Sequence, residues 1–319
     1  MAGLRPSSEK CIQALSTILS PRLRASFPIL FVLLWSTGFI VARYGMPYAE
    51  PMTFLLLRFL LALGILLPLI LLMQAPWPEP RLALRIALAG ALLQAGYLGG
   101  VWAAVRDGMT AGLVALIVGL QPIITACLAS LANERLRPYQ WLGLALGLLG
   151  VGLVVWAKLS LTGLTALSLG LSVLALASIT AGTLYQKKFC PQFDLRTGTA
   201  VQYLAAALIC LPWVFGVETR DIAWTVELIG ALAWSVLAIS LGAIFLLFVL
   251  IREGAATQVT SLLYLTPPTT ALLAFFLFDE PITLLTVLGT LSTAVGVWLV
   301  MRPSRKRATL KTPTSTGEK

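Results

Sequence analysis

Histidine is absent from this chain of 319 residues, and cysteine occurs only four times, at Cys11, Cys127, Cys190 and Cys210. The cysteines form no Cys-x-x-Cys pair, and no histidine is available to complete a ligand set, which argues against a zinc site. A G-x-x-x-x-G-K-[ST] phosphate-binding loop is also missing, so the chain has no ATPase of its own. We therefore expect no metal and no cofactor.

Charge is also scarce. Charged residues make up 11% of the chain and hydrophobic residues 58%, whereas a soluble domain has about 25% charged and about 45–50% apolar residues. A water-soluble fold could not bury this much apolar surface, so the composition predicts a protein embedded in the lipid bilayer. The net charge of +10 comes from Lys and Arg spread through short loops and tails. This spread is unlike the basic stripe that binds nucleic acid, so we expect no nucleic-acid partner.

The apolar residues fall into ten runs, separated by proline, charged and turn residues. A membrane-spanning helix needs about 20 apolar residues, so the sequence predicts an all-α membrane protein with ten transmembrane helices. The breaks are short, which makes consecutive helices antiparallel and leaves no room for a soluble domain. The runs are 27–45, 52–73, 83–105, 109–131, 138–157, 166–186, 197–217, 228–251, 255–278 and 282–301.

Lysine and arginine are distributed unevenly between the two sides of these spans. With the N-terminus inside, 18 of them fall on the cytoplasmic side and 4 outside, while Arg58 lies within a span. Because loops rich in Lys and Arg stay in the cytoplasm, we predict a multi-pass protein of the cell inner membrane with both termini cytoplasmic. The polar segment 1–24 is interpreted as a tail that sets this orientation, although it also resembles a weak transit peptide.

The two halves of the chain match when the sequence is shifted against itself. At a shift of 146 residues, 106–155 meet 252–301 without a gap, and 12 of the 50 positions are identical. Shifts of 142–144 residues relate the earlier spans of each half. The informative matches are Arg106 with Arg252, Gly108 with Gly254, Pro122 with Pro268, Glu134 with Glu280, Pro68 with Pro212, and Arg58-Phe59 with Gln202-Tyr203.

Each half contains five spans, an odd number, so the second half must cross the membrane in the opposite orientation. Inverted repeats of this kind are typical of secondary transporters, which bind their substrate near the membrane midplane between the repeats. We predict a cytoplasmic tail at 1–26, a first repeat at 27–157, a second repeat at 158–301 and a basic cytoplasmic tail at 302–319.

Several segments resemble the drug/metabolite transporter superfamily, specifically its EamA-type permeases. They are 34–39 in the first span, 57–59 in the second, and the paired stretches 121–134 and 266–281 with the glycine-rich spans that follow. The resemblance covers about residues 27–301. It implies export of amino acids, other metabolites or drugs through a central cavity lined by spans 1–4 and 6–9. It also implies that spans 5 and 10 lie at the periphery, where they could support a homodimer.

Arg58 is the sharpest candidate for substrate binding. It lies about seven residues into its span, or about 10 Å deep at 1.5 Å per residue. A charge at this depth is costly unless it faces a cavity or a partner. We interpret it as an anchor for a carboxylate or phosphate of the substrate. The alternative is a structural arginine that extends to the membrane surface or caps helix carbonyls.

Polar and aromatic residues near the middle of other spans are further candidates. Gln94 and Tyr97 lie between glycines in the third span, where they could line a cavity. Trp35 and Ser36 lie in the first span, although a serine can simply bond to the carbonyl one turn back. Trp102, nearer the end of the third span, could instead anchor the helix at the membrane interface.

Proline marks matching positions of spans 4 and 9. Gln121 precedes Pro122 in one span, and Pro267 and Pro268 follow Tyr264 in the other. Because proline frees a carbonyl and kinks a helix, we predict helix kinks at the three prolines. Paired breaks in two repeats point to a transport site, so Gln121 and Tyr264 join the binding candidates.

Acidic residues are missing from the middle of every predicted span, which leaves no obvious proton carrier or membrane-embedded catalytic centre. We interpret Glu134 and Glu280 as helix caps. The sequence therefore predicts a transporter and not an enzyme: a facilitator or exchanger that moves a small metabolite, expected to be an amino acid or related compound, by alternating access, with export the expected direction. The alternatives are a drug, nucleoside or sugar carrier of the same fold, or a membrane-embedded partner or sensor without transport activity.

Overall fold

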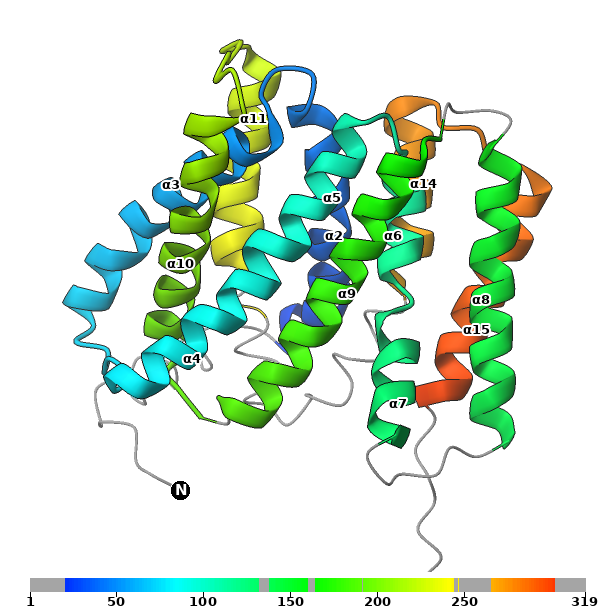
Figure 1. Ribbon diagram of the computed structural model, residues 1–319, viewed down its shortest axis with the longest axis horizontal. Coiled ribbons are helices and arrows are strands. Elements are labelled where there is room, and N and C mark those ends of the chain that lie inside the picture. The colour runs from blue at the N-terminus through cyan, green and yellow to red at the C-terminus, as the bar shows by residue number, and fades with distance from the viewer. Residues whose placement is uncertain are drawn as a thin grey trace, which may run out of the picture.

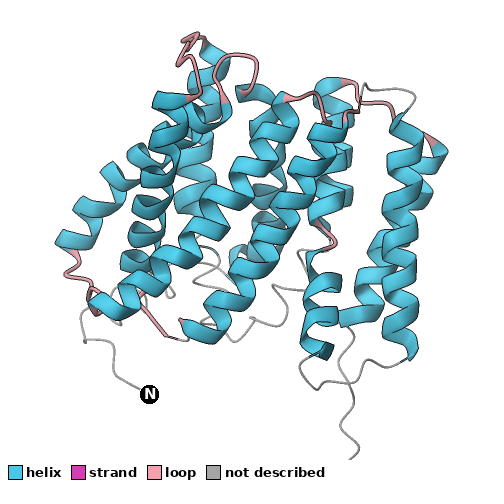
Figure 2. Cartoon of the chain, in the orientation of Figure 1, coloured by secondary structure: helices cyan, strands magenta, loops and turns pink. Residues whose placement is uncertain are grey.

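The computed structural model describes residues 21–131, 138–159, 164–190, 192–243, 246 and 265–301. Over these residues the chain is helical and contains no strand (Figures 1 and 2). Six helices are long and apolar enough to cross a membrane, and four shorter apolar helices accompany them. The all-helical class predicted from the sequence is thereby confirmed for the described residues. The count of ten spans stays a prediction, because parts of two predicted spans, 228–251 and 255–278, lie outside the described residues.

The helices follow the predicted apolar runs closely. In the first half they are α2 (Pro21–Gly45), α3 (Pro51–Leu72), α4 (Pro80–Gly90), η1 (Ala91–Gly96), α5 (Tyr97–Arg106), α6 (Ala111–Val118), α7 (Gln121–Leu131) and α8 (Pro138–Leu159). In the second half they are α9 (Ala166–Phe189), α10 (Leu195–Gly216), α11 (Val226–Trp234), η2 (Ser235–Ala243), α14 (Thr266–Phe278) and α15 (Leu284–Met301).

Corresponding helices of the two halves run in opposite directions. In Figure 1, α2 and α4–α5 rise from the lower end of the bundle, whereas α9 and α11–η2, their counterparts in the repeat, descend. Two pairs of counterparts pack directly against each other: α3 with α10, and α8 with α15. The helices are therefore arranged as two inverted halves around a shared axis, as the sequence shift predicts.

Two π-helical segments occupy equivalent positions in the halves. The segment η1 begins at Ala91 and η2 at Ser235, which are 144 residues apart, the same shift that matches Pro68 with Pro212. A π-helical stretch inserts one extra residue in a turn and is often found at functional sites. The repeat thus extends to an irregularity of the backbone that the sequence did not predict.

The pair α8 and α15 lies at the right-hand edge of the bundle in Figure 1, where the family resemblance places spans 5 and 10. Glycines allow the close approach: a Cβ atom on Gly150 would lie 2.4 Å from the carbonyl oxygen of Gly289, and one on Gly296 would lie 2.5 Å from that of Gly143. The outer faces are apolar, with Trp156 73% exposed. Such surfaces are stable in lipid but not in water.

Candidate functional site

A cavity of about 220 Å³ lies between the two halves. It is bordered by α2, α3 and η1–α5 of the first half and by α9, α10 and η2 of the second. Of the described helices that the resemblance also places around the cavity, α6, α7 and α14 contribute no lining residue. The lining residues are Trp35, Gly38, Phe39, Arg58, Leu93, Gln94, Tyr97, Leu98, Trp102, Ile179, Gln186, Phe193, Leu195, Thr199, Gln202, Tyr203 and Ile239.

Arg58 of α3 supplies the positive charge of the cavity. Its side chain is buried, its Nε donates a 3.0 Å hydrogen bond to Oγ of Ser240 on η2, and its Nη1 has no hydrogen-bond partner. No carboxylate forms an ion pair with it within the described part of the chain. The cavity lining likewise includes no Asp or Glu. The guanidinium is therefore a buried cation with free hydrogen-bonding capacity.

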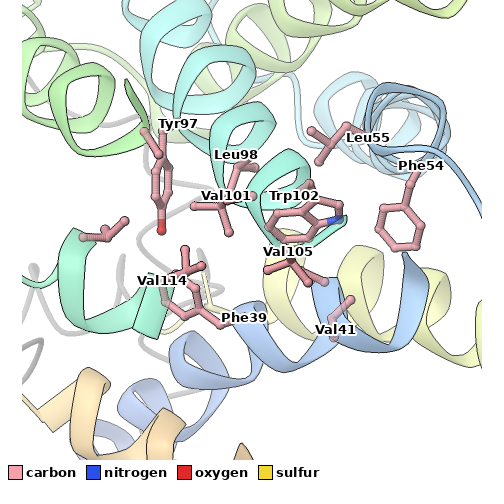
Figure 3. Close-up of a cluster of buried hydrophobic side chains, with 14 of the residues drawn as sticks. Phe39, Val41, Phe54, Leu55, Tyr97, Leu98, Val101, Trp102, Val105 and Val114 are labelled. Carbon is pink, nitrogen blue, oxygen red and sulfur yellow. The ribbon is translucent and has the colours of Figure 1, made fainter. Parts of the chain in front are cut away.

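Aromatic side chains surround this guanidinium. Its central carbon lies 5.7 Å from the ring centroid of Trp102, a distance at which a cation is attracted to the ring face. Tyr203 stacks on Phe59 at 5.5 Å and donates a weak 3.4 Å hydrogen bond to the carbonyl of Ser240. Figure 3 shows Trp102 and Tyr97 projecting from α5 in the cluster that also holds Phe39 of α2. Trp102 is only 1% exposed, so it is a core residue and not an interfacial anchor.

Three glutamines add neutral polar groups. Nε2 of Gln202 donates a 2.8 Å hydrogen bond to Oε1 of Gln186, which joins α10 to α9. Gln94, on η1, lines the cavity from the opposite half. Gln202 is the counterpart of Arg58 in the repeat, so the two halves present an amide and a guanidinium at equivalent positions. The site can thus accept a carboxylate at one side and polar neutral groups at the other.

The cavity extends toward the lower end of the bundle. Its outermost lining residues include Phe193 and Leu195, which lie at the connection between α9 and α10. The lower end also carries Arg81, Arg85, Lys187 and Lys188, at the start of α4 and the end of α9.

Hydrogen bonds join the two halves at the upper end. The carboxylate of Glu218 accepts bonds of 2.7 Å from the backbone amides of Met52 and Thr53 and from the Thr53 hydroxyl. These amides are among the unpaired donors at the start of α3, where a carboxylate also interacts favourably with the helix dipole. The carboxylate of Glu50 accepts a bond from the amide of Arg220 in return. We call these contacts the upper clasp.

A further carboxylate caps a helix at this end. Oε1 of Glu280 accepts a 3.2 Å hydrogen bond from the amide of Ala111 at the start of α6. Glu280 therefore does cap a helix, but the capped helix is α6 of the other half and not, as was predicted, the span that follows Glu280 in the sequence. Glu134 lies outside the described residues.

Four predicted binding residues, Arg58, Gln94, Tyr97 and Trp35, line the cavity together. Two do not. Ser36 is fully buried against α14, where its carbonyl accepts a 3.3 Å bond from Thr270. Gln121 donates a 3.0 Å bond to Thr183 of α9 and does not line the cavity. Tyr264 lies outside the described residues.

The three prolines that were predicted to kink helices, Pro122, Pro267 and Pro268, lie instead in the first turns of helices. Pro122 is the second residue of α7, and the chain turns at Gly119 and Leu120 between α6 and α7. Pro267 and Pro268 are in the first turn of α14, and the chain before Leu265 lies outside the described residues. A Cβ atom on Gly119 would lie 2.7 Å from Cγ of Pro267, so the α6–α7 break packs against the start of α14.

Sequence reasoning missed Gln186, Thr199, Tyr203, Phe193 and the hydrogen-bonding partner of Arg58. A signal existed for one of them: the 144-residue shift that pairs Arg58-Phe59 with Gln202-Tyr203 places Tyr203 beside the counterpart of Arg58. The rest carry no mark in the sequence, because amides and aromatics also occur on helix faces away from the cavity.

The two halves each match the model of the EamA-like transporter family, over residues 24–156 and 166–302. The chain belongs to the EamA-like transporter family. Among similar proteins, the "Uncharacterized inner membrane transporter YedA" of Escherichia coli (strain K12) is 29% identical over 260 residues, covering 80% of this chain and 83% of that protein. The "Probable amino-acid metabolite efflux pump" of the same strain is 26% identical over 296 residues, covering 89% and 96%.

A solved crystal structure shares the fold. It superposes with a TM-score of 0.61 at 15% identity and covers 88% of this chain and 98% of that one. Membership of the EamA-like family, together with the inner-membrane name of a relative and the apolar helices, identifies a multi-pass membrane transporter. The family match also confirms that the chain is built from two repeats.

Proposed function

We propose that this EamA-like protein is a secondary carrier that exports a small metabolite bearing a carboxylate, an amino acid or related compound, by alternating access through the cavity between its repeats. The single observation that carries the proposal is the buried Arg58 guanidinium, which faces the cavity with an unpartnered nitrogen and no ion-paired carboxylate in the described residues. An incoming carboxylate would satisfy both the charge and the free donors.

The remaining lining suits the rest of such a substrate. The walls are aromatic and aliphatic, and the glutamine amides can bond to neutral or zwitterionic polar groups. None of the described lining residues is acidic, which disfavours cationic drugs, one of the alternatives that the sequence left open. The name of one relative, an amino-acid metabolite efflux pump, supports the same substrate class.

A cavity that opens toward the cytoplasm lets the carrier load its substrate there, as export requires, while the substrate gradients set the net direction of flow. The bias of Lys and Arg assigns the lower end to the cytoplasm and both termini with it. The upper clasp would then close the outer side, and the conformation described above would accept substrate from the cytoplasm. Peripheral α8 and α15, with apolar outer faces, would be the contact surface of a homodimer if one forms.

The test uses purified protein in liposomes that are loaded with a pool of labelled amino acids and surrounded by the same pool without label. We expect efflux above that of protein-free liposomes without a pH gradient, a reduction of about tenfold or more in Arg58→Gln, and partial recovery in Arg58→Lys. Arg81→Gln is the matched control, because Arg81 is an exposed arginine outside the cavity.

A second measurement separates charge from shape. Phenethylamine, which has the aromatic body of phenylalanine without its carboxylate, should compete weakly with labelled L-phenylalanine, while 3-phenylpropionate should compete well. Efflux that is unchanged in Arg58→Gln would refute the role of Arg58. No efflux of any amino acid would refute the proposed substrate class.

A further inference from the structure

The charge of Arg58 bears on how the carrier returns after it releases its substrate. In the conformation described above, the cavity is the route by which an anion reaches the guanidinium from the lower end. The only hydrogen bond of its side chain within the described residues goes to Oγ of Ser240, a neutral acceptor, and the nearby Trp102 ring gives a weaker attraction.

Alternating access requires the lower end to close before the upper end opens. If the cavity is empty when this happens, Arg58 is left as a buried cation with no counter-ion. An unpaired buried charge is strongly unfavourable, whereas a paired and hydrogen-bonded one is tolerated. A carboxylate in the cavity provides the pairing. The loaded carrier should therefore cross the closed state much more readily than the empty one.

We infer that this protein works as an exchanger of carboxylate-bearing substrates, in which the return step is fast only when a second carboxylate binds from the opposite side. The inference rests on the proposed function and deepens it. The sequence left a facilitator and an exchanger open, and the unpaired guanidinium favours the exchanger. One substrate moves each way per cycle, so the exchange of two substrates of equal charge moves no net charge and needs neither a proton gradient nor a membrane potential.

The neighbour of Arg58 allows this inference to be tested with a matched pair of variants. Oγ of Ser240 is 3.0 Å from Nε of Arg58, so Ser240→Asp places a carboxylate beside the guanidinium as a permanent counter-ion. Ser240→Asn introduces nearly the same volume without the charge. Any difference between the two variants therefore reports the counter-ion and not the change in packing.

The experiment measures labelled L-phenylalanine efflux from proteoliposomes, or efflux of another amino acid if the pool experiment selects it. Efflux is recorded with and without the same unlabelled amino acid outside, with the membrane potential clamped at zero. We expect outside substrate to accelerate efflux by about tenfold or more in the unmodified protein and in Ser240→Asn. A tenfold ratio corresponds to about 1.4 kcal/mol between the barriers of the empty and loaded forms.

In Ser240→Asp the ratio should fall toward one, because the empty carrier is already neutralised. Arg58→Gln should lower the ratio in the same way, and it provides a second measurement if the aspartate variant does not fold. A ratio near one in the unmodified protein would overturn the exchanger while leaving the carrier intact. Equal ratios in Ser240→Asp and Ser240→Asn would overturn the counter-ion explanation. No efflux under any condition would overturn the proposed function itself, and the exchanger with it.

Discussion

The upper clasp predicts that Glu218 holds the protein in the conformation that opens toward the lower end. In Glu218→Gln the side chain keeps its shape but loses its negative charge and one of its two acceptor oxygens. Hydrogen bonds to a charged group contribute about 1.5–3 kcal/mol each, and neutral ones about 1 kcal/mol. Glu218 is half-buried, so water can form some of the hydrogen bonds that the glutamine no longer makes. We therefore expect the clasp to weaken by about 1–2 kcal/mol.

A change of this size raises the population with an open upper end by a factor of about 5–30. Hydrogen exchange reports it directly, because the amides of Met52 and Thr53 donate to Glu218 and are released when the clasp opens. Their exchange should accelerate by the same factor in Glu218→Gln. The matched control is Glu227→Gln, which removes an exposed carboxylate at the start of α11. Equal exchange rates at Met52 and Thr53 in all three proteins would refute the clasp.

Two further predictions concern helix packing and pH. Gly150→Ala should destabilise the protein by about 1–3 kcal/mol, because the added Cβ would meet the carbonyl oxygen of Gly289. The loss should appear as a lower thermal midpoint in detergent. Gly152→Ala is the control and should change that midpoint little, because its Cβ would face open space. Burial raises the pKa of Asp194, but hydrogen bonds from Arg196 outweigh burial and hold that pKa below its usual value. Its contribution to the start of α10 is therefore present at neutral pH and lost as the pH falls through the lowered pKa. Measured against the intrinsic exchange rate at each pH, the protection of the amides at 195–198 should fall on acidification, and Asp194→Asn should show lower protection at neutral pH and little further change.

The sequence predicted the helices and the repeat well, because both depend on residue type along the chain. Apolar runs of sufficient length define helices in a membrane, and the shift of 142–146 residues relates their order and direction. The glycine-rich spans 138–157 and 282–301 become α8 and α15, which pack against each other through these glycines. Within the site, Arg58 was found because a charge deep in an apolar helix stands out.

The inward-facing side of each helix was harder to predict. In a soluble protein, polar residues mark the outer face of a helix, but here lipid and core are both apolar, so the sequence hardly distinguishes them. Ser36 and Trp35 are neighbours, yet only Trp35 lines the cavity. Gln121 and Gln94 are both amides within apolar runs, and only Gln94 does so. The cross-half contact of Glu280 depends on how the repeats pack, which no local pattern encodes.

Within the described residues, the lower end shows no carboxylate contact like the upper clasp. The counterpart of Glu218 at a shift of 144 is Gln74. The end of α3 and the start of α10 are joined there by two weaker bonds, from the Thr197 hydroxyl to the carbonyl of Pro76 and from Nη1 of Arg196 to the sulfur of Met73. An empty carrier biased in this way rests open to one side and therefore has a lower apparent KM there. In a carrier that moves one substrate without coupling to another gradient, net flow can be measured in each direction across the membrane. Detailed balance then requires the ratio of the maximal rate to KM to be the same in both directions. The side of tighter apparent binding must therefore also be the side of slower maximal net transport, so the clasp sets the working concentration range on each face of the membrane but not the direction of flow.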